Sequence, residues 1–116
     1  MRIGELSHRT GVSVRLLRYY EAQGLLAPTR TSNRYREYGP DAPELVARIR
    51  CLLAAGLSTR TIAEVLPCLR DDGRSIAPTC PESRARIATE RDRVATTIDD
   101  LRRSLDLLSG IVTAGA

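Results

Sequence analysis

The most constraining feature of this sequence is a heptad pattern of apolar residues in its C-terminal third. Seven apolar side chains recur there at steps of seven, four, three, four, three and four residues: Ile87, Val94, Ile98, Leu101, Leu105, Leu108 and Val112. Only Arg91 interrupts the apolar a and d positions. A helix of about 26 residues is about 39 Å long, too long to be buried against so small a domain. The pattern predicts a dimerisation coiled coil, and the alternative is one long helix folded onto its own domain.

The size of the chain limits the functions it can perform. Its 116 residues are enough for one small domain and one further element, which argues against a large enzyme that closes over its substrate. The sequence shows no Ser/His/Asp group, no paired carboxylates and no glycine-rich phosphate loop. We therefore expect no enzymatic activity and no cofactor.

Charge is distributed unevenly along the chain. All 18 basic residues are arginine, and the formal net charge is +4. Residues 1–60 hold ten arginines and five acids, whereas residues 61–116 hold eight arginines and nine acids. A GC-rich genome can explain the missing lysine but not this asymmetry. The basic N-terminal half indicates a polyanionic partner. All four tyrosines also lie in this half, where they can contact phosphates or fill a small core.

Glycine and serine mark the limits of two short helices near the N-terminus. A helix that begins at Ile3 ends before Gly11, and Ser13 caps a second helix from Val14 to about Ala22. Two short helices joined by such a turn are typical of a helix-turn-helix motif.

Further elements follow in order. Residues 29–38 are rich in turn formers and then alternate, which predicts a β-hairpin or wing. A third helix follows and ends at Gly56, and Ser58 caps a fourth with Ile62, Val65, Leu66 and Leu69 on one face. Residues 70–81 are charged and contain proline, which predicts a connector. The predicted fold is mainly α, with a small β wing, a helical pair and the long helix.

The second helix carries a basic face. Arg15, Arg18 and Tyr19 share this face by their spacing, while Leu16, Leu17 and the ring of Tyr20 can pack inward. A guanidinium group there matches the N7 and O6 edge of guanine in the major groove. The alternative is a solvated basic face.

Five segments of the chain carry a resemblance to a known family. They are Ile3–Leu6, Thr10–Glu21, Gly24–Leu26, Arg34–Tyr38 and Ala55–Ser58. Together they resemble the MerR family of transcriptional regulators over roughly residues 1–70. The resemblance implies a winged helix-turn-helix, a helical pair that acts as a second wing, and a long helix that pairs antiparallel with its twin.

The resemblance also implies how the residues are used. We expect a DNA-binding domain over residues 1–70, a connector over 71–81, a dimerisation helix over 82–112 and a tail over 113–116. The implied DNA contacts are Ser13, Arg15, Arg18, Tyr19 and Tyr20 on the recognition helix, Arg34, Tyr35, Arg36 and Tyr38 on the wing, and Ser58, Thr59 and Arg60 at the start of the fourth helix. Unpaired amides at that helix start also suit a phosphate.

The function implied is that of a homodimeric regulator bound to double-stranded DNA at a pseudo-palindromic promoter. Its two recognition helices would enter successive major grooves. The resemblance implies that the protein distorts the promoter and so re-aligns the contacts of RNA polymerase, which makes the polymerase an indirect partner. Contacts of the wing with the bent DNA would offset the free-energy cost of deforming it. With no signal peptide and no apolar run of membrane length, we expect a cytoplasmic protein without a membrane partner. The sequence does not indicate an effector.

Three cysteines support an alternative function. Cys51, Cys68 and Cys80 are spaced by 17 and 12 residues, which fits neither a disulfide framework nor a CxxC metal motif. Metal-sensing members carry a cysteine near the start of the long helix, where Cys80 stands, and further ligands after it, which residues 110–116 lack. We therefore predict no metal site. Cys51 follows Ile49 and precedes Leu52 and Leu53 on the third helix, so we predict that it is buried and inert. The alternative is a thiol redox sensor or metal-binding module centred on Cys68 and Cys80.

Overall fold

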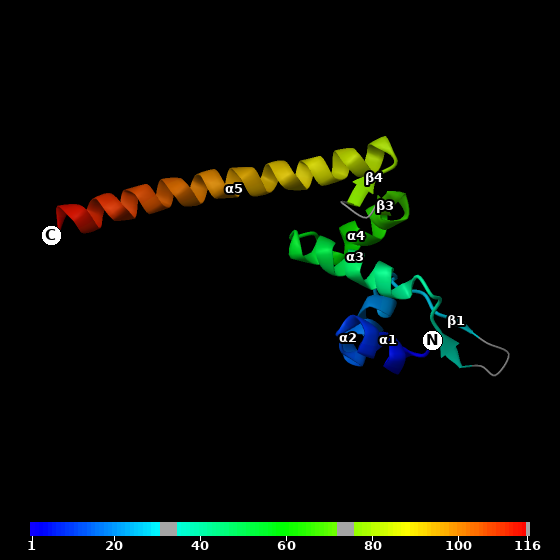
Figure 1. The fold of residues 1–116 in the computed structure, drawn as a ribbon. Helices are drawn as coiled ribbons and strands as arrows, with labels where there is room; N and C mark the ends of the chain where they lie inside the picture. Colours follow the sequence, from blue (N-terminus) through cyan, green and yellow to red (C-terminus); the bar gives the residue numbers. More distant parts are fainter. Residues whose placement is uncertain (31–34, 72–75, 116) are drawn as a thin grey trace. The chain divides into compact units, whose positions relative to one another are not determined.

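The computed structural model describes residues 1–30, 35–71 and 76–115, which fall into two compact units, Met1–Thr79 and Cys80–Ala116. Within the described residues, the first unit contains four α-helices, one 3-10 helix and two pairs of short strands, and the second is one long helix (Figure 1). The mainly α fold predicted from the sequence is confirmed. None of the helices in the described part of the chain combines the length and apolar character needed to cross a bilayer.

The predicted helix-turn-helix is formed by α1 (Ile3–Thr10) and α2 (Val14–Ala22). Gly11 ends α1 in the left-handed conformation, with φ at 72°, and its N–H donates to the carbonyl of Ser7. The Ser13 hydroxyl oxygen accepts the N–H of Leu16 at 3.1 Å and so caps α2. Both limits depend on neighbouring residues alone.

A mainly aliphatic core that also contains Tyr20 and Tyr38 holds the first unit together. α1 contacts α2 and α3 (Ala42–Ala54), and α3 contacts α4 (Thr59–Val65). The largest fully buried side chains are Leu6, Leu17, Tyr20, Val46, Ile49, Ile62 and Val65. This packing fixes one side of α2 and leaves its opposite side on the surface.

The predicted wing is an antiparallel pair. In it, β1 (Thr29–Arg30) and β2 (Arg36–Glu37) place Thr29 opposite Glu37 and Arg30 opposite Arg36. Next to this pair, the N–H of Tyr38 donates to the carbonyl of Met1 at 2.6 Å. The terminal ammonium group of Met1 donates back to the carbonyl of Tyr38 at 2.7 Å. The first residue therefore ties down the end of the wing.

Residues 66–78 differ from the prediction. The fourth helix ends at Val65 and continues as a 3-10 turn, η1 (Leu66–Cys68). β3 (Leu69–Asp71) then pairs antiparallel with β4 (Ile76–Pro78), so residues expected to form a connector contain a second small sheet. Leu69 is buried, but on a strand and not on the helix predicted for it. The proline within the 3-10 turn cannot donate a helical hydrogen bond, which favours this early end.

Cys51 also differs from the prediction, because it is exposed on α3. Val46, Ile49 and Leu52 occupy the buried side of that helix, and Cys51 follows Ile49 by about 200° of helical rotation. It therefore lies on the opposite side.

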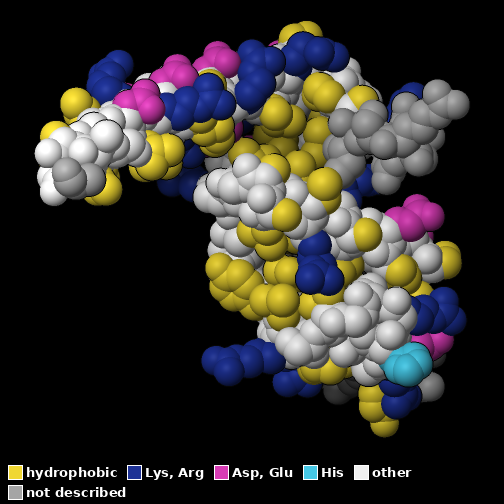
Figure 2. Space-filling view, turned by 60° about the vertical axis from the view of Figure 1, so that its left-hand side comes forward, with side chains coloured by type: hydrophobic (Ala, Val, Ile, Leu, Met, Phe, Trp, Pro, Cys, Tyr) yellow, Lys and Arg dark blue, Asp and Glu magenta, His cyan; other side chains and the backbone are white. Residues whose placement is uncertain are grey.

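The second unit is α5 (Pro81–Ala114), 34 residues long. The heptad residues from Val94 to Val112 are exposed, from 45% for Ile98 to 74% for Val112, while Ile87 is half-buried. Figure 2 shows apolar side chains along one side of this helix and charged side chains along another. An exposed apolar stripe at this spacing is typical of a coiled-coil strand.

Candidate nucleic-acid interface

The outer side of α2 presents three of the residues predicted to contact DNA. Arg15 and Arg18 are exposed, and Tyr19 is 47% exposed. Ser13, at the start of the helix, is exposed as well. These side chains supply guanidinium donors for base edges and hydroxyl groups for phosphates, on a helix that the core holds from behind.

Leu16 lies on this surface, although it was predicted to pack inward. Its side chain is 39% exposed. With Ser13, Arg15 and Tyr19 it lines a shallow hollow of about 290 Å³. An apolar side chain at such a place has the chemistry to contact a thymine methyl group.

Two predicted contact residues belong to the core. Tyr20 and Tyr38 are each 2% exposed, so their rings offer almost no surface to DNA. The ring of Tyr20 is tilted against that of Tyr19, with centroids 6.4 Å apart. The hydroxyl of Tyr38 donates to Glu21 Oε2 at 3.2 Å. The prediction of direct DNA contacts by Tyr20 and Tyr38 is therefore corrected, because tyrosine also serves as a core residue when its hydroxyl finds a partner.

A carboxylate that the sequence analysis missed lies in the last turn of α2. The side chain of Glu21 is 18% exposed. It accepts the Tyr38 hydroxyl, and Arg36 Nη1 lies 3.4 Å from its Oε2 and 3.3 Å from its Oε1. An acid near the negative end of a helix dipole is unfavourable on its own, and this was the available signal that Glu21 needs cationic or donor partners. Burial raises the pKa of Tyr38, and the charge and hydrogen bond of Glu21 raise it further.

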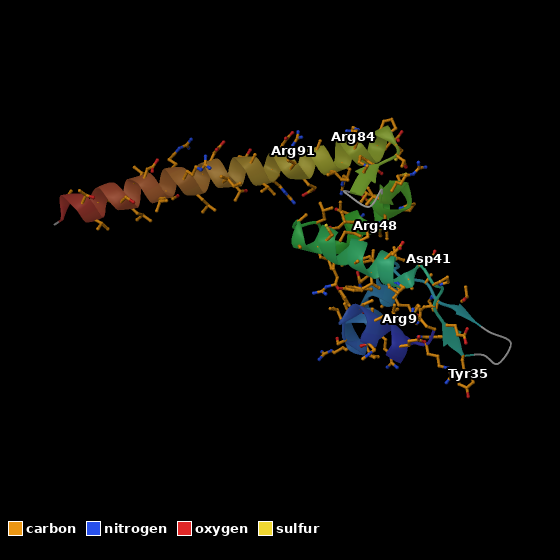
Figure 3. The ribbon with its side chains drawn as sticks, viewed as in Figure 1. Arg9, Tyr35, Asp41, Arg48, Arg84 and Arg91 are labelled. Atoms are coloured by element: carbon orange, nitrogen blue, oxygen red, sulfur yellow. The ribbon has the colours of Figure 1, made fainter. Side chains whose placement is uncertain are left out.

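Arg36 and Tyr35 of the wing make contacts within the chain and still keep about half of their surface exposed. Arg36 keeps 54% of its side chain exposed despite its ion pair with Glu21. Tyr35 is 53% exposed and projects from the wing (Figure 3). The guanidinium of Arg2, another residue missed by the sequence analysis, lies 4.2 Å from the centroid of the Tyr35 ring, a cation–π distance. Arg34 lies outside the described residues.

The start of α4 approaches the end of α2. Ser58 caps α4 by accepting the N–H of Thr61 at 3.1 Å. The hydroxyl of Thr59 donates to Gln23 Oε1, at the end of α2, at 3.1 Å. Arg60 keeps 90% of its side chain exposed beside Glu64, 3.8 Å away. The predicted residues of β2 and α4 therefore lie on elements that each contact the end of α2.

The two cysteines of the alternative function lie in different units. The carbonyl of Cys68, in η1, accepts the N–H of Thr79 at 2.6 Å and its hydroxyl at 2.8 Å. Cys80 occupies the N-cap of α5, with its Sγ 3.1 Å from the Ser83 hydroxyl. Among the residues the structure describes, no group of three or more His, Cys, Asp or Glu side chains is placed to hold a metal ion.

The sequence of this chain is similar to those of known regulatory proteins. Residues 1–69 match the family described as MerR HTH family regulatory protein. Heavy metal-dependent transcription regulator 2 of Rhizobium meliloti is 35% identical over 111 residues, which are 95% of this chain and 75% of that protein. The regulator HmrR of Sinorhizobium medicae is 36% identical over 94% of this chain and 74% of its own length.

Solved structures agree with this comparison. The transcription regulator PbrR691 from Ralstonia metallidurans CH34, in complex with lead(II), has a TM-score of 0.73 at 29% identity, over 93% of this chain and 81% of that one. HiNmlR, a MerR family regulator lacking the sensor domain and bound to promoter DNA, has a TM-score of 0.59 at 24% identity, over 97% and 86% of the two chains. At 24% identity, the likeness to HiNmlR shows a shared fold and no more.

Proposed function

Because the chain belongs to the MerR HTH family of regulatory proteins and is a DNA-binding transcriptional regulator, we propose that it binds a pseudo-palindromic promoter as an antiparallel homodimer and acts by distorting the DNA. The observation that carries this proposal is the exposed arginine face of α2, held from behind by a buried core. RNA polymerase would respond indirectly, through the reshaped promoter. We propose no catalytic activity, and we place the action of the protein in the cytoplasm, with the promoter DNA.

The proposed contacts divide by chemistry. On α2, Arg18 would read a guanine edge, while Ser13, Arg15 and Tyr19 would support it or reach phosphates. The wing and α4 would hold the backbone through Tyr35, Arg36, Ser58, Thr59 and Arg60, and Arg34 stays a prediction for the wing.

Binding to DNA is tested by measuring affinity against salt. We expect the logarithm of the binding constant to fall linearly with the logarithm of salt concentration, because phosphate contacts release counterions. A genomic footprint would then identify the operator and the target gene. Equal retention on the footprinted site and on scrambled duplex would contradict sequence-specific binding. Distortion is tested separately, by energy transfer between dyes at the two ends of the operator, and an unchanged end-to-end distance would contradict it.

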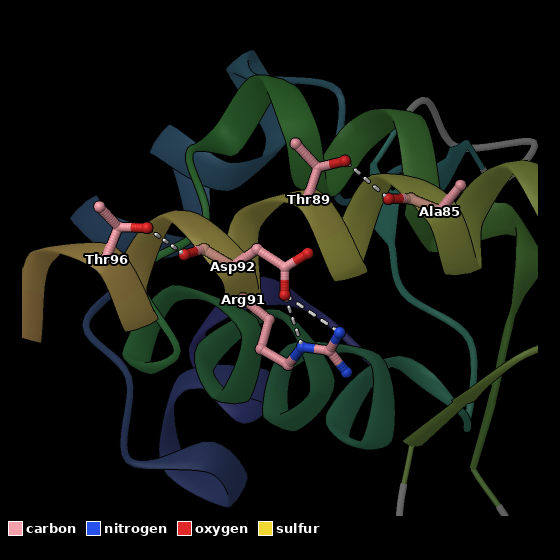
Figure 4. A network of polar contacts seen from close by, with 5 residues as sticks. All are labelled: Ala85, Thr89, Arg91, Asp92 and Thr96. Carbon is pink, nitrogen blue, oxygen red and sulfur yellow. Dashed lines mark hydrogen bonds and ion pairs between the residues drawn. The ribbon is translucent and has the colours of Figure 1, made fainter. Parts of the chain in front are cut away.

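Arg91 favours antiparallel pairing of α5. In a parallel coiled coil, equal positions face each other, so two Arg91 guanidinium groups would meet in the apolar seam. In one antiparallel register, Ile98 faces the partner's Leu101, and Arg91 faces the partner's Leu108. The Arg91 side chain already bonds Asp92 Oδ1 of its own helix, through Nη2 at 3.1 Å and Nε at 3.2 Å (Figure 4). Its guanidinium can therefore remain at the edge of the seam.

Cross-linking tests this orientation. In a background where the native cysteines are serine, we expect an equimolar mixture of Ile98→Cys and Leu101→Cys chains to form mixed disulfide dimers on oxidation. In a parallel dimer, Ile98→Cys chains alone would cross-link efficiently, since identical positions face each other. That result would contradict the antiparallel arrangement.

Metal dependence is not part of the proposed function. Relatives are named for heavy metals, and one solved relative contains lead(II). The described residues of this chain do not fit such a group by themselves, because Cys80 has the Ser83 hydroxyl as its neighbour and no cluster of three metal-ligating side chains is present among them. The relatives also do not favour a thiol sensor centred on Cys68 and Cys80 in place of DNA binding.

A further inference from the structure

We propose that the last turn of α2 is a joint that fixes the orientation of the β wing and of α4 relative to the recognition helix, α2. Glu21 is the positioning residue for the β wing, and Gln23 is the positioning residue for α4. This inference rests on the proposed function, because the placement of the wings matters when DNA is bound. Neither residue was among the predicted DNA contacts, and neither needs to touch DNA for this role.

The contacts of Glu21 tie α2 to the β wing. Arg36 and Tyr38 are separated by one residue, and side chains at that spacing lie on the same side of an extended strand. Both converge on the Glu21 carboxylate, 15 and 17 residues away in sequence. Bonds to a charged acceptor are about twice as strong as neutral ones, and the low exposure of Glu21 limits screening by solvent. The carboxylate therefore fixes the angle at which the wing leaves the recognition helix.

The contact of Gln23 ties the same turn to α4. Gln23 is the C-cap of α2, and its Oε1 accepts the hydroxyl of Thr59, the first residue of α4, 36 residues further along the chain. Residues two apart differ by about 200° in direction around a helix. Glu21 and Gln23 can therefore serve elements on different sides of α2. The Gln23 bond is neutral and exposed, so its effect is the smaller one.

Arg36 connects this joint to DNA. One side of its guanidinium group faces Glu21, while 54% of the side chain remains exposed. A guanidinium has five N–H donors, so it can bond Glu21 and a DNA phosphate at once. Glu21 thus holds the arginine in the orientation in which a phosphate on the distorted DNA would meet it.

The first measurement uses the full chain without DNA. Glu21→Ala should raise amide hydrogen exchange at residues 36–38 and leave the exchange of α2 close to wild type. Gln23→Ala should instead raise exchange at the start of α4. Glu44→Ala, which removes an exposed carboxylate from the first turn of α3, is the matched control and should change neither region. Unchanged exchange at residues 36–38 in Glu21→Ala would overturn the proposed joint.

The second measurement is DNA binding as a function of salt. Glu21→Ala should lower the salt slope by about one unit, for one lost phosphate contact, and weaken operator binding about tenfold. The ratio of operator to scrambled affinity should persist, because Arg18 is untouched. Glu21→Gln keeps an acceptor for Tyr38 but loses the charge facing Arg36, so its effect should be intermediate.

A purely structural role for Glu21 gives a different result. In that case Glu21→Ala would lose affinity in proportion to its unfolded fraction, measured by thermal unfolding, with the wild-type salt slope. This would overturn the positioning role. If the wild-type chain itself showed no salt-dependent binding to duplex DNA, the proposed function would fail, and the exchange measurement would still decide whether the joint exists.

Discussion

At the scale of single residues, Arg18 is the side chain whose loss should most reduce sequence discrimination. It is exposed on the outer side of α2, and its guanidinium matches the guanine edge. Arg18→Ala should cost about 1–3 kcal/mol on the operator and much less on scrambled duplex, measured by fluorescence anisotropy at fixed salt. Arg60→Ala on α4 serves as the control and should weaken both duplexes alike. An equal loss on both duplexes for Arg18→Ala would contradict its role in base reading.

Tyr38 should make the stability of the first unit dependent on alkaline pH. Burial and Glu21 raise the pKa of Tyr38 in the folded chain above its ordinary value of 10.0. A raised pKa gives a stabilisation that is complete below about pH 10 and is lost as pH rises through the folded-state pKa. Tyr38→Phe should therefore unfold more easily at pH 7, by about 1–2 kcal/mol for the lost bond to Glu21. The difference from wild type should shrink above pH 10.

Urea unfolding from pH 7 to pH 11.5 measures this difference. All other groups are the same in both proteins, so the difference in unfolding free energy between wild type and Tyr38→Phe reports on Tyr38. A difference that stays constant across this range would argue against the raised pKa.

At the scale of elements, the turn between α1 and α2 depends on the backbone of Gly11. A Cβ atom at this position would meet nothing within 4 Å, so a side chain adds strain without a clash. Gly11→Ala should destabilise the chain by about 1–2 kcal/mol through the left-handed conformation alone. Gly4→Ala, in the open helical part of α1, should stabilise it by about 0.5–1 kcal/mol. Urea midpoints of the two variants should shift in opposite directions, and a shift in the same direction would contradict this account.

Elements with local signals could be predicted from the sequence. Gly11 and Ser13 end and begin helices through bonds to residues three or four positions away, so the helix-turn-helix was predicted within its observed limits. The wing followed from its turn formers. By contrast, β3 and β4 are three residues each and exist through pairing with each other, which short segments without alternation do not reveal.

The sequence predicted the ends of the helices better than it predicted which side chains are buried. Apolar residues occupy more than one side of both α2 and α3, so Leu16 and Cys51 were assigned to the buried side, although both are exposed. Tyr38 and Glu21 depend on contacts across 17 residues, which no local pattern encodes. The exposure of Arg15 and Arg18 on α2 was therefore predictable from the sequence, and the contacts of Glu21 and Tyr38 beside them were not.

At the scale of the whole molecule, the seam of α5 should control assembly. Leu101 and Leu107 are each 64% exposed in the single chain, but only Leu101 lies on the heptad positions. Leu101→Asp would place a charge in the apolar interface at a cost of several kcal/mol, so it should yield monomers with poor operator affinity. Leu107→Asp, the matched control, should remain dimeric. Light scattering separates these outcomes, and a dimeric Leu101→Asp protein would mean that the interface lies elsewhere.

An apolar stripe left open on each chain makes the proposed regulator sensitive to its own abundance. Below the dissociation constant of the dimer, the concentration of dimer rises with the square of the concentration of chains. Promoter occupancy then changes more steeply than the concentration of chains, so halving that concentration would lower the concentration of dimer to about one quarter. The length and continuity of the stripe set the dissociation constant of the dimer. Substitutions along the stripe would therefore change the concentration of chains at which the target gene responds.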